Sequence, residues 1–210
     1  KTPKALGAEA DVILLCVTGA AQVEAVLTGP DGLIQGLKSG TIIIDCSTSI
    51  PSATQQLAQQ VQKAGGVMID AAMTRTPKEA AEGRLNLLVG SDDQTFEKIK
   101  PLLACFAENI NHVGPVGAGH QMKLLHNYVS LGTVTVIAEA AACARKSGID
   151  PATFVDVLAK GGGGGVALER LKPYLINDGD TSNLKFTLSN AVKDLGYYTT
   201  YASDTHADHL

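Results

Sequence analysis

The sequence feature that most constrains this chain is a glycine-rich turn that passes directly into a long helix, at residues 114–130. Gly117 and Gly119 permit backbone angles or close approaches that a Cβ atom would obstruct. After residue 118 the residues that break helices become rare, so the sequence predicts a helix over 118–147. Strand patterns precede this helix and none follows it, which indicates a boundary between two kinds of structure.

Two polar side chains stand near the start of the predicted helix. Lys123 and Asn127 are four residues apart, so they lie one turn above each other on one face. The unpaired N–H groups and the positive dipole of a helix start favour an anion there. We interpret the pair as a candidate site; the alternative is a solvated lysine on a capped interdomain helix.

The chain ahead of this helix alternates strand-like and helix-like segments. Continuous apolar runs are typical of parallel strands covered on both faces, and helices tend to begin at proline or a polar cap and to end at glycine. In the helix expected after Ser91, Pro101 is predicted to act as a break. The expected strands are residues 11–17, 41–46, 67–70, 85–90 and 109–113.

This alternation predicts an α/β domain at residues 1–116 and an all-helical domain at 117–210, joined by the long hinge helix. The helical domain should contain one helix from Pro151 to the glycine run at 161–165 and a last helix from residue 184 past Tyr201. Ordering five glycines costs much backbone entropy. The run is therefore either a mobile linker or a loop whose backbone approaches something closely.

Three short patterns follow one another in the chain. D-x-S-T-x-x-P occupies residues 45–51, G-x-x-G-x-G-x-x-x-K-x-x-x-N occupies 114–127, and K-D-L occupies 193–195. Together they resemble the β-hydroxyacid dehydrogenase family, the group related to 3-hydroxyisobutyrate and 6-phosphogluconate dehydrogenases. The resemblance covers nearly the whole chain, and it implies an incomplete Rossmann-type first domain and NAD or NADP as the cofactor.

The resemblance also implies roles for the matching residues. Lys123 would transfer the proton to or from the reacting oxygen, and Asn127 would orient the same hydroxyl. Ser47 would help to hold the acid group of a small anionic hydroxyacid or aldehyde. The alternatives are a helix cap for the hydroxyl cluster and an ordinary turn after the first strand. The residues implied to face the nicotinamide half of the cofactor are Val17, Thr18, Thr48 and Lys193.

One segment departs from the family pattern. Family members usually continue after the third strand with Ser-Gly-Gly, whereas this chain has Arg75 and Thr76 there. A planar guanidinium suits a trigonal or tetrahedral anion, and members that reduce a sulfonated aldehyde carry an arginine in this segment. We therefore expect these two residues to bind a carboxylate or sulfonate. The alternative is a surface ion pair of the arginine with Glu79 or Glu82.

The composition argues against several other classes of function. The net charge of −4 and the absence of a Lys/Arg run argue against nucleic acid and membrane surfaces as partners. No apolar run reaches transmembrane length. No metal site is expected, since His206 and His209 lack a third ligand. The four cysteines form no C-x-x-C pair and are expected to be reduced, buried thiols of a cytoplasmic protein: Cys16, Cys46, Cys105 and Cys143.

Both ends of the family pattern are missing. No G-x-G-x-x-G turn precedes the first expected strand, so on the order of 60 residues, two ~30-residue units, are expected before Lys1. That part would contain the residue that selects NAD or NADP. The last family helices have no counterpart after Leu210. We interpret the chain as an internal portion of an enzyme that forms a homodimer or homotetramer; the alternatives are a non-catalytic dinucleotide-binding relative and an assembly module.

Overall fold

The computed structural model describes residues 1–177 and 179–207. The chain forms two compact units, of which the first consists of residues 1–125 and 196–207 and the second of residues 126–195. Two helices run across the division: α6 (Ala118–Lys146) and α9 (Leu188–Asp204). The predicted long helix is thus confirmed almost to the residue.

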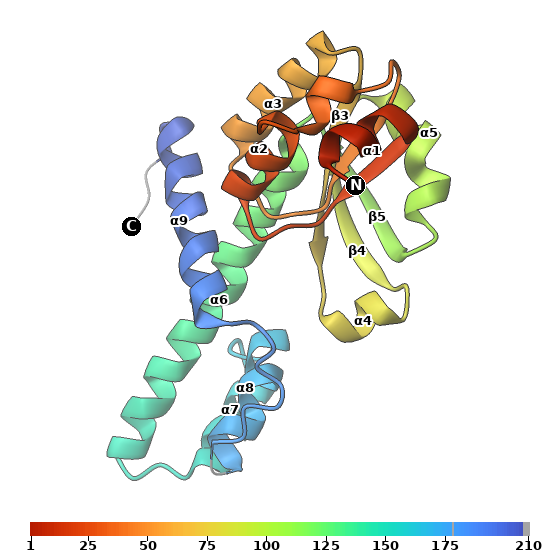
Figure 1. Cartoon of the computed structure of the whole chain (residues 1–210). Helices are drawn as coiled ribbons and strands as arrows, with labels where there is room; N and C mark the ends of the chain where they lie inside the picture. Colours follow the sequence, from red (N-terminus) through yellow and green to blue (C-terminus); the bar gives the residue numbers. More distant parts are fainter. Residues whose placement is uncertain (178, 208–210) are drawn as a thin grey trace. The chain divides into compact units, whose positions relative to one another are not determined.

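A five-stranded sheet forms the centre of the first unit (Figure 1). Its first three strands are parallel, the third and fourth are antiparallel, and the last two are parallel again. The strands follow the order of the chain: β1 (Val12–Leu15), β2 (Ile42–Asp45), β3 (Val67–Thr74), β4 (Leu85–Gly90) and β5 (Ala107–Gly114). The helices of this unit are α1 (Pro3–Glu9), α2 (Ala20–Thr28), the 3-10 helix η1 (Leu33–Gly36), α3 (Pro51–Lys63), α4 (Pro77–Ala81) and α5 (Asp93–Leu103).

The sheet buries apolar side chains on both faces, because successive residues of a strand point to opposite sides. In β2, Ile43 packs in one core with side chains of α2 and α3. Its neighbour Ile44 packs in the other core with side chains of α5. The Rossmann-type arrangement expected from the continuous apolar runs is therefore confirmed.

The second unit is helical, as the sequence predicted. Between the ends of α6 and α9 it contains α7 (Pro151–Lys160) and α8 (Val166–Ile176). Asp150 caps α7 by accepting a hydrogen bond from the backbone N–H of Thr153 at 2.8 Å. The glycine run forms the turn between α7 and α8, where Gly165 has a φ of 129°.

Several local predictions were wrong. Pro101 does not end a helix, because it lies in the last turn of α5, where the missing N–H removes only one helical bond. β3 continues beyond Asp70 to Thr74, since this extension pairs with the antiparallel β4. Three α-helices were not predicted, namely α1, α4 and α8, and neither was the 3-10 helix η1.

The cysteine prediction is only partly confirmed. All four thiols are free, but only Cys46 is buried, at the end of β2. The other three thiols are exposed: Cys16 follows β1, Cys105 follows α5, and Cys143 lies within α6. Among the helices of the described residues, none combines the length and hydropathy needed to cross a membrane.

Candidate functional site

The carboxyl ends of the three parallel strands carry a buried polar row. The strand register places Leu15 beside Asp45, and Asp45 beside Asp70. Ser47 then follows β2, and its backbone N–H donates to Asp45 Oδ1 at 2.9 Å. The Ser47 Oγ accepts the backbone N–H of Val17 at 3.0 Å. This hydrogen bond links the segments that follow β1 and β2. Ser47 is only 3% exposed, so the link lies inside the protein.

The carboxylate of Asp70 holds the start of α6. Its two oxygens accept the backbone N–H groups of Gly117 and His120, each at 2.7 Å. These are amide groups that a helix start leaves without a partner in the helix itself. Burial raises the pKa of Asp70, while the charge of His120 and the hydrogen bonds to the carboxylate oppose that shift.

The close approach of Asp70 explains the glycines of the hinge motif. Gly117 has a φ of 97°, which disfavours other residues. A Cβ atom on Gly119 would lie 2.3 Å from the carbonyl oxygen of Leu88 and 2.7 Å from Asp70 Oδ2. The glycine spacing therefore lets the helix start directly against β3 and β4.

His120 lies at the centre of this cluster, fully buried, and the sequence analysis missed it. Its Nε2 is 3.1 Å from the carbonyl oxygen of Ser47, and its Nδ1 is 2.8 Å from Thr54 Oγ1. The carboxylates of Asp45 and Asp70 each lie 3.9 Å from a ring nitrogen. The only sequence signal was its place three residues before Lys123, on the same helical face.

Lys123 lies one turn further along α6 and is 9% exposed. A lysine is rarely so buried, so the solvated-lysine alternative does not describe this side chain. Of the residues predicted to face the nicotinamide, Val17 at the end of β1 is half-buried, Thr18 is exposed, and Thr48 after β2 is half-buried.

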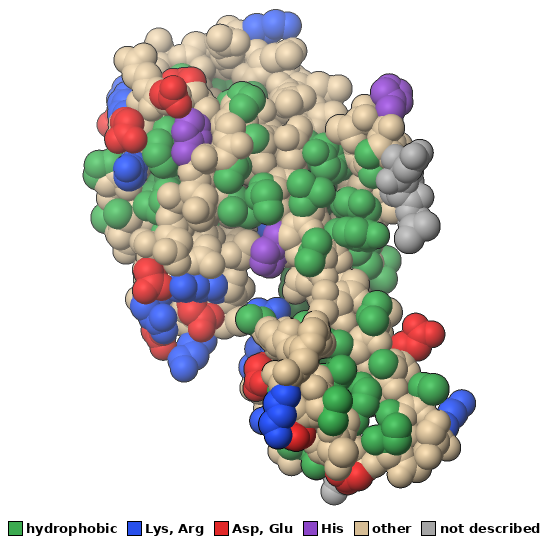
Figure 2. All heavy atoms as spheres, turned by 180° about the vertical axis from the view of Figure 1, so that it is seen from behind, with side chains coloured by type: hydrophobic (Ala, Val, Ile, Leu, Met, Phe, Trp, Pro, Cys, Tyr) green, Lys and Arg blue, Asp and Glu red, His purple; other side chains and the backbone are tan. Residues whose placement is uncertain are grey.

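Arg75 and Thr76 are not brought to Ser47. Arg75 lies five residues beyond Asp70 along the chain, or roughly 16 Å of extended strand. The guanidinium pairs with Glu108 and donates to the carbonyl oxygen of Arg84. The ion pair expected as the alternative is therefore present, with Glu108 in place of Glu79 or Glu82. Figure 2 shows this concentration of charged side chains around α4.

The backbone of these two residues has its own features. Arg75 has a φ of 80°, in the left-handed region that favours glycine. Thr76 forms a capping box with Glu79, whose carboxylate accepts from both the backbone N–H and the hydroxyl of Thr76. Thr76 therefore begins α4, with Pro77 in its first turn.

The second unit contains a separate polar cluster. Asn127 Nδ2 donates to Asp194 Oδ2 at 2.6 Å, and Asn127 Oδ1 lies 3.0 Å from His126 Nδ1. Lys193 Nζ forms an ion pair with Asp194 Oδ1 at 3.1 Å. The geometry of this pair is not that of a hydrogen bond, and Asp194 Oδ1 accepts no hydrogen bond from the described residues. Asp194 is 2% exposed. The motif residues Asn127, Lys193 and Asp194 are thus brought together, with His126 as a neighbour that the sequence analysis missed.

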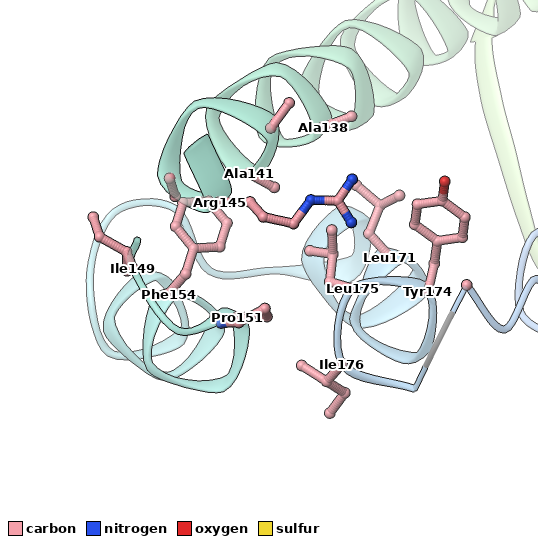
Figure 3. A pocket seen from close by; sticks show the side chains of 13 residues that line it. Ala138, Ala141, Arg145, Ile149, Pro151, Phe154, Leu171, Tyr174, Leu175 and Ile176 are labelled. Carbon is pink, nitrogen blue, oxygen red and sulfur yellow. The ribbon is translucent and has the colours of Figure 1, made fainter. Parts of the chain in front are cut away.

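The helical unit also contains a cavity of about 560 Å³. Figure 3 shows the guanidinium of Arg145 extending among Leu171, Leu175 and Tyr174. None of the predicted site residues lines this cavity. In the described part of the chain no three His, Cys, Asp or Glu side chains gather as metal ligands, and His209 lies outside that part.

The sequence matches two known family models along almost the whole chain. Residues 1–114 match the NAD binding domain of 6-phosphogluconate dehydrogenase, and residues 117–209 match the NAD-binding domain of NADP-dependent 3-hydroxyisobutyrate dehydrogenase. Together with the Rossmann-type sheet, they define an oxidoreductase class whose cofactor is NAD or NADP. Within that class, the chain belongs to the β-hydroxyacid dehydrogenase family, as its three motifs predicted.

Individual relatives agree with this assignment. The chain is 33% identical over 191 residues to 2-(hydroxymethyl)glutarate dehydrogenase of Eubacterium barkeri, covering 91% of this chain and 63% of that protein. It is 32% identical to 2-hydroxy-3-oxopropionate reductase of Escherichia coli, covering 77% and 55%. The structure of Mycobacterium tuberculosis 3-hydroxyisobutyrate dehydrogenase with L-serine has a TM-score of 0.88 at 26% identity, covering 98% of this chain and 72% of that one.

The end of β1 is compatible with a dinucleotide cofactor. Helix α2 begins there at Gly19, with no side chain capping its first turn. A helix start of this kind favours a negatively charged group. The backbone N–H of Ala20 is bonded to Tyr197 Oη at 3.2 Å, so α9 contributes to this edge as well.

Proposed function

We propose that the protein is an NAD(P)-dependent oxidoreductase that interconverts a small β-hydroxyacid and the corresponding aldehyde. The observation that carries this proposal is Lys123, a buried lysine one turn beyond the anchored start of α6. The relatives support the reaction class, since they are named for small hydroxyacids and aldehydes. The chain spans about 63% of the Eubacterium relative, so the activity is proposed for the whole protein.

The cofactor supplies the hydride chemistry when it is bound. Lys123, as an ammonium, protonates the developing alkoxide during reduction, and as an amine it accepts that proton during oxidation. Asn127 orients the same hydroxyl through its side-chain amide, which Asp194 and His126 hold in place. We assign the nicotinamide half of the cofactor to four residues: Val17, Thr18, Thr48 and Lys193.

We propose that the substrate carries a carboxylate or a sulfonate. Ser47 is one proposed contact of that group, and Arg75 with Thr76 is the alternative contact, because the structure does not bring Arg75 to Ser47. Arg75 offers a full charge and several N–H donors, which suit an anion with two or three oxygens. In this structure the guanidinium of Arg75 forms an ion pair with Glu108. An anionic substrate therefore has to compete with that carboxylate, and this competition gives the proposal a specific test.

The protein is proposed to work in the cytoplasm as a homodimer or homotetramer. Four free cysteines fit a reducing compartment. Light scattering of the full-length protein would give its mass. The alternatives, a non-catalytic dinucleotide-binding relative and an assembly module, predict no turnover, and they leave the buried Lys123 without a role.

The direct test is Lys123→Ala in the full-length enzyme. Loss of a general acid–base typically costs about 10²–10⁴-fold in rate, so kcat should fall by that factor while the affinity for NAD(P)H is preserved. Initial rates are followed by nicotinamide absorbance, and cofactor affinity by calorimetry. Lys63→Ala, a change at the end of α3, is the control. Near-normal turnover of Lys123→Ala would remove this lysine from the mechanism.

A further inference from the structure

The cluster around His120 goes beyond the roles assigned so far. We propose that His120 is a positioning residue that fixes Lys123 relative to the carboxyl edge of the sheet, and this inference rests on the proposed function of Lys123. His120 does not itself touch substrate or cofactor in this assignment. It acts through the backbone of Ser47 and through the orientation of α6.

The first step is the connection between helix and sheet. His120 Nε2 donates to the carbonyl oxygen of Ser47 at 3.1 Å, and Nδ1 contacts Thr54 Oγ1 at 2.8 Å. Ser47 belongs to the segment after β2, whereas Thr54 belongs to α3. One side chain of α6 therefore bonds to two elements that are more than sixty residues away in the sequence.

The second step is the rotation of the helix about its own axis. Asp70 accepts the backbone N–H groups of Gly117 and His120, which fixes the position of the helix start. Bonds to backbone amides near the axis restrain rotation weakly, because their lever arm is short. The ring of His120 extends away from the axis and bonds at its far end, so it restrains rotation more strongly. Lys123 follows three residues later on the same face and takes its direction from that rotation.

The third step is the cost of losing the ring. Asp45 and Asp70 lie 3.9 Å from its two nitrogens, and both carboxylates are fully buried. Asp45 Oδ2 has no hydrogen-bond partner among the described side chains, so the imidazole is the polar group that faces it. Buried polar groups are costly when a partner is removed. An apolar side chain at position 120 would leave these groups to rearrange, and α6 would shift with them.

The chain offers a matched control in His112 of β5. This ring is partly buried, whereas that of His120 is fully buried, and the Nε2 of His112 also bonds to a backbone carbonyl, that of Ser91, at 2.9 Å. It stacks on Phe96 at 4.5 Å between ring centroids and belongs to the same unit as His120. Its partners Ser91, Asp93 and Phe96 all belong to α5 or to the two residues before it, so His112→Leu removes a comparable histidine whose bonds are made away from His120.

The experiment compares His120→Leu, His120→Gln and His112→Leu in the full-length enzyme. A misplacement of about 1 Å can cost 10²-fold in rate, so His120→Leu should lower kcat about 10- to 100-fold, with KM for NAD(P)H within about twofold. His120→Gln keeps an N–H donor and should recover most of the loss. His112→Leu should keep the wild-type kcat. Equal kcat values for wild type and His120→Leu would overturn the proposal.

A second measurement is independent of turnover. In the full-length protein, the rate at which an amine-acylating reagent modifies Lys123 is measured by peptide mass spectrometry, with the exposed Lys63 as an internal reference. Thr54→Val, which removes one bond of the ring, is included in case His120→Leu does not fold. We expect the acylation rate of Lys123 to change at least about threefold in the His120 and Thr54 variants, because a buried amine is shielded from the reagent. The rate in His112→Leu should stay at the wild-type value.

The two measurements separate the possible failures. An unchanged Lys123 rate in every folded His120 and Thr54 variant would overturn the positioning role, whatever the enzyme does. A changed rate in a protein that shows no turnover would support positioning and refute the proposed function instead. A change that also appears in His112→Leu would reflect general loosening of the unit, and it too would overturn the proposal.

Discussion

Gly119→Ala tests how closely α6 approaches the sheet. The added Cβ would lie 2.3 Å from the carbonyl oxygen of Leu88, 2.7 Å from Asp70 Oδ2 and 3.1 Å from the backbone N of Gly90. Ordinary contacts of a Cβ begin at 3.4 Å, so the helix start and β4 would have to separate by roughly 1 Å. Two of these atoms are backbone and the third is a buried carboxylate, so no flexible side chain can turn away.

The expected destabilisation is about 2 kcal/mol. Overpacking of this kind costs about 1–3 kcal/mol, and alanine returns only a few tenths of a kcal/mol in the first turn of a helix. With an m-value of about 2–3 kcal/mol per molar urea, the midpoint of unfolding should fall by about 0.7–1 M. The assay is urea denaturation followed by circular dichroism at 222 nm.

Gly132→Ala, in the middle of the same helix, is the matched substitution. No atom lies within 4 Å of its added Cβ, so alanine should stabilise the helix by about 0.5–1 kcal/mol. The two changes are chemically identical and should have opposite signs. If Gly119→Ala unfolds at or above the wild-type midpoint, then α6 does not begin at the spacing described here.

Two further predictions concern Arg75 and Asp70. Because Glu108 competes for the guanidinium, Arg75→Ala should lower kcat/KM for an anionic substrate about 5- to 30-fold, and Glu108→Gln should raise it up to about fivefold, with a neutral aldehyde little affected by either. Equal effects on both substrates would return Arg75 to a surface role. Burial raises the pKa of Asp70 in the folded state above its ordinary value of 3.8, so the folded state binds this proton more tightly than the unfolded state does. The stability that this proton contributes is fully present below pH 3.8 and is lost as pH rises through the pKa of the folded state. As pH rises from below 3.8 through the raised pKa of the folded state, the unfolding free energy of wild type should therefore fall relative to Asp70→Asn; a pH-independent difference would contradict this.

Much of the fold could be predicted because its signals are local. The strands are short apolar runs, and the helices carry proline, polar caps and glycine at their ends. Residues 118–146 contain a single glycine after the first turn, so α6 could be predicted within one residue of its end. The direction of β4 has no such signal, because pairing with β3 depends on contacts between distant segments.

The same distinction holds for the candidate site. Lys123, Asn127 and Lys193 could be identified because they belong to spaced motifs. His120 and His126 are single histidines, which create no periodicity and no pattern of their own. The position of Arg75 depends on the extension of β3 and on Glu108, thirty-three residues further along the chain, so its surroundings could not be derived from neighbouring residues.

The way in which α6 begins also determines what the helix can transmit. Its 29 residues correspond to a rod of about 43 Å, and Asp70 holds one end of that rod by two amide bonds. For a rigid rod, a tilt of about 5° at the held end displaces the free end by about 4 Å. A rearrangement of this one carboxylate that tilted a rigid α6 would therefore displace the far end of the helix by much more than its start.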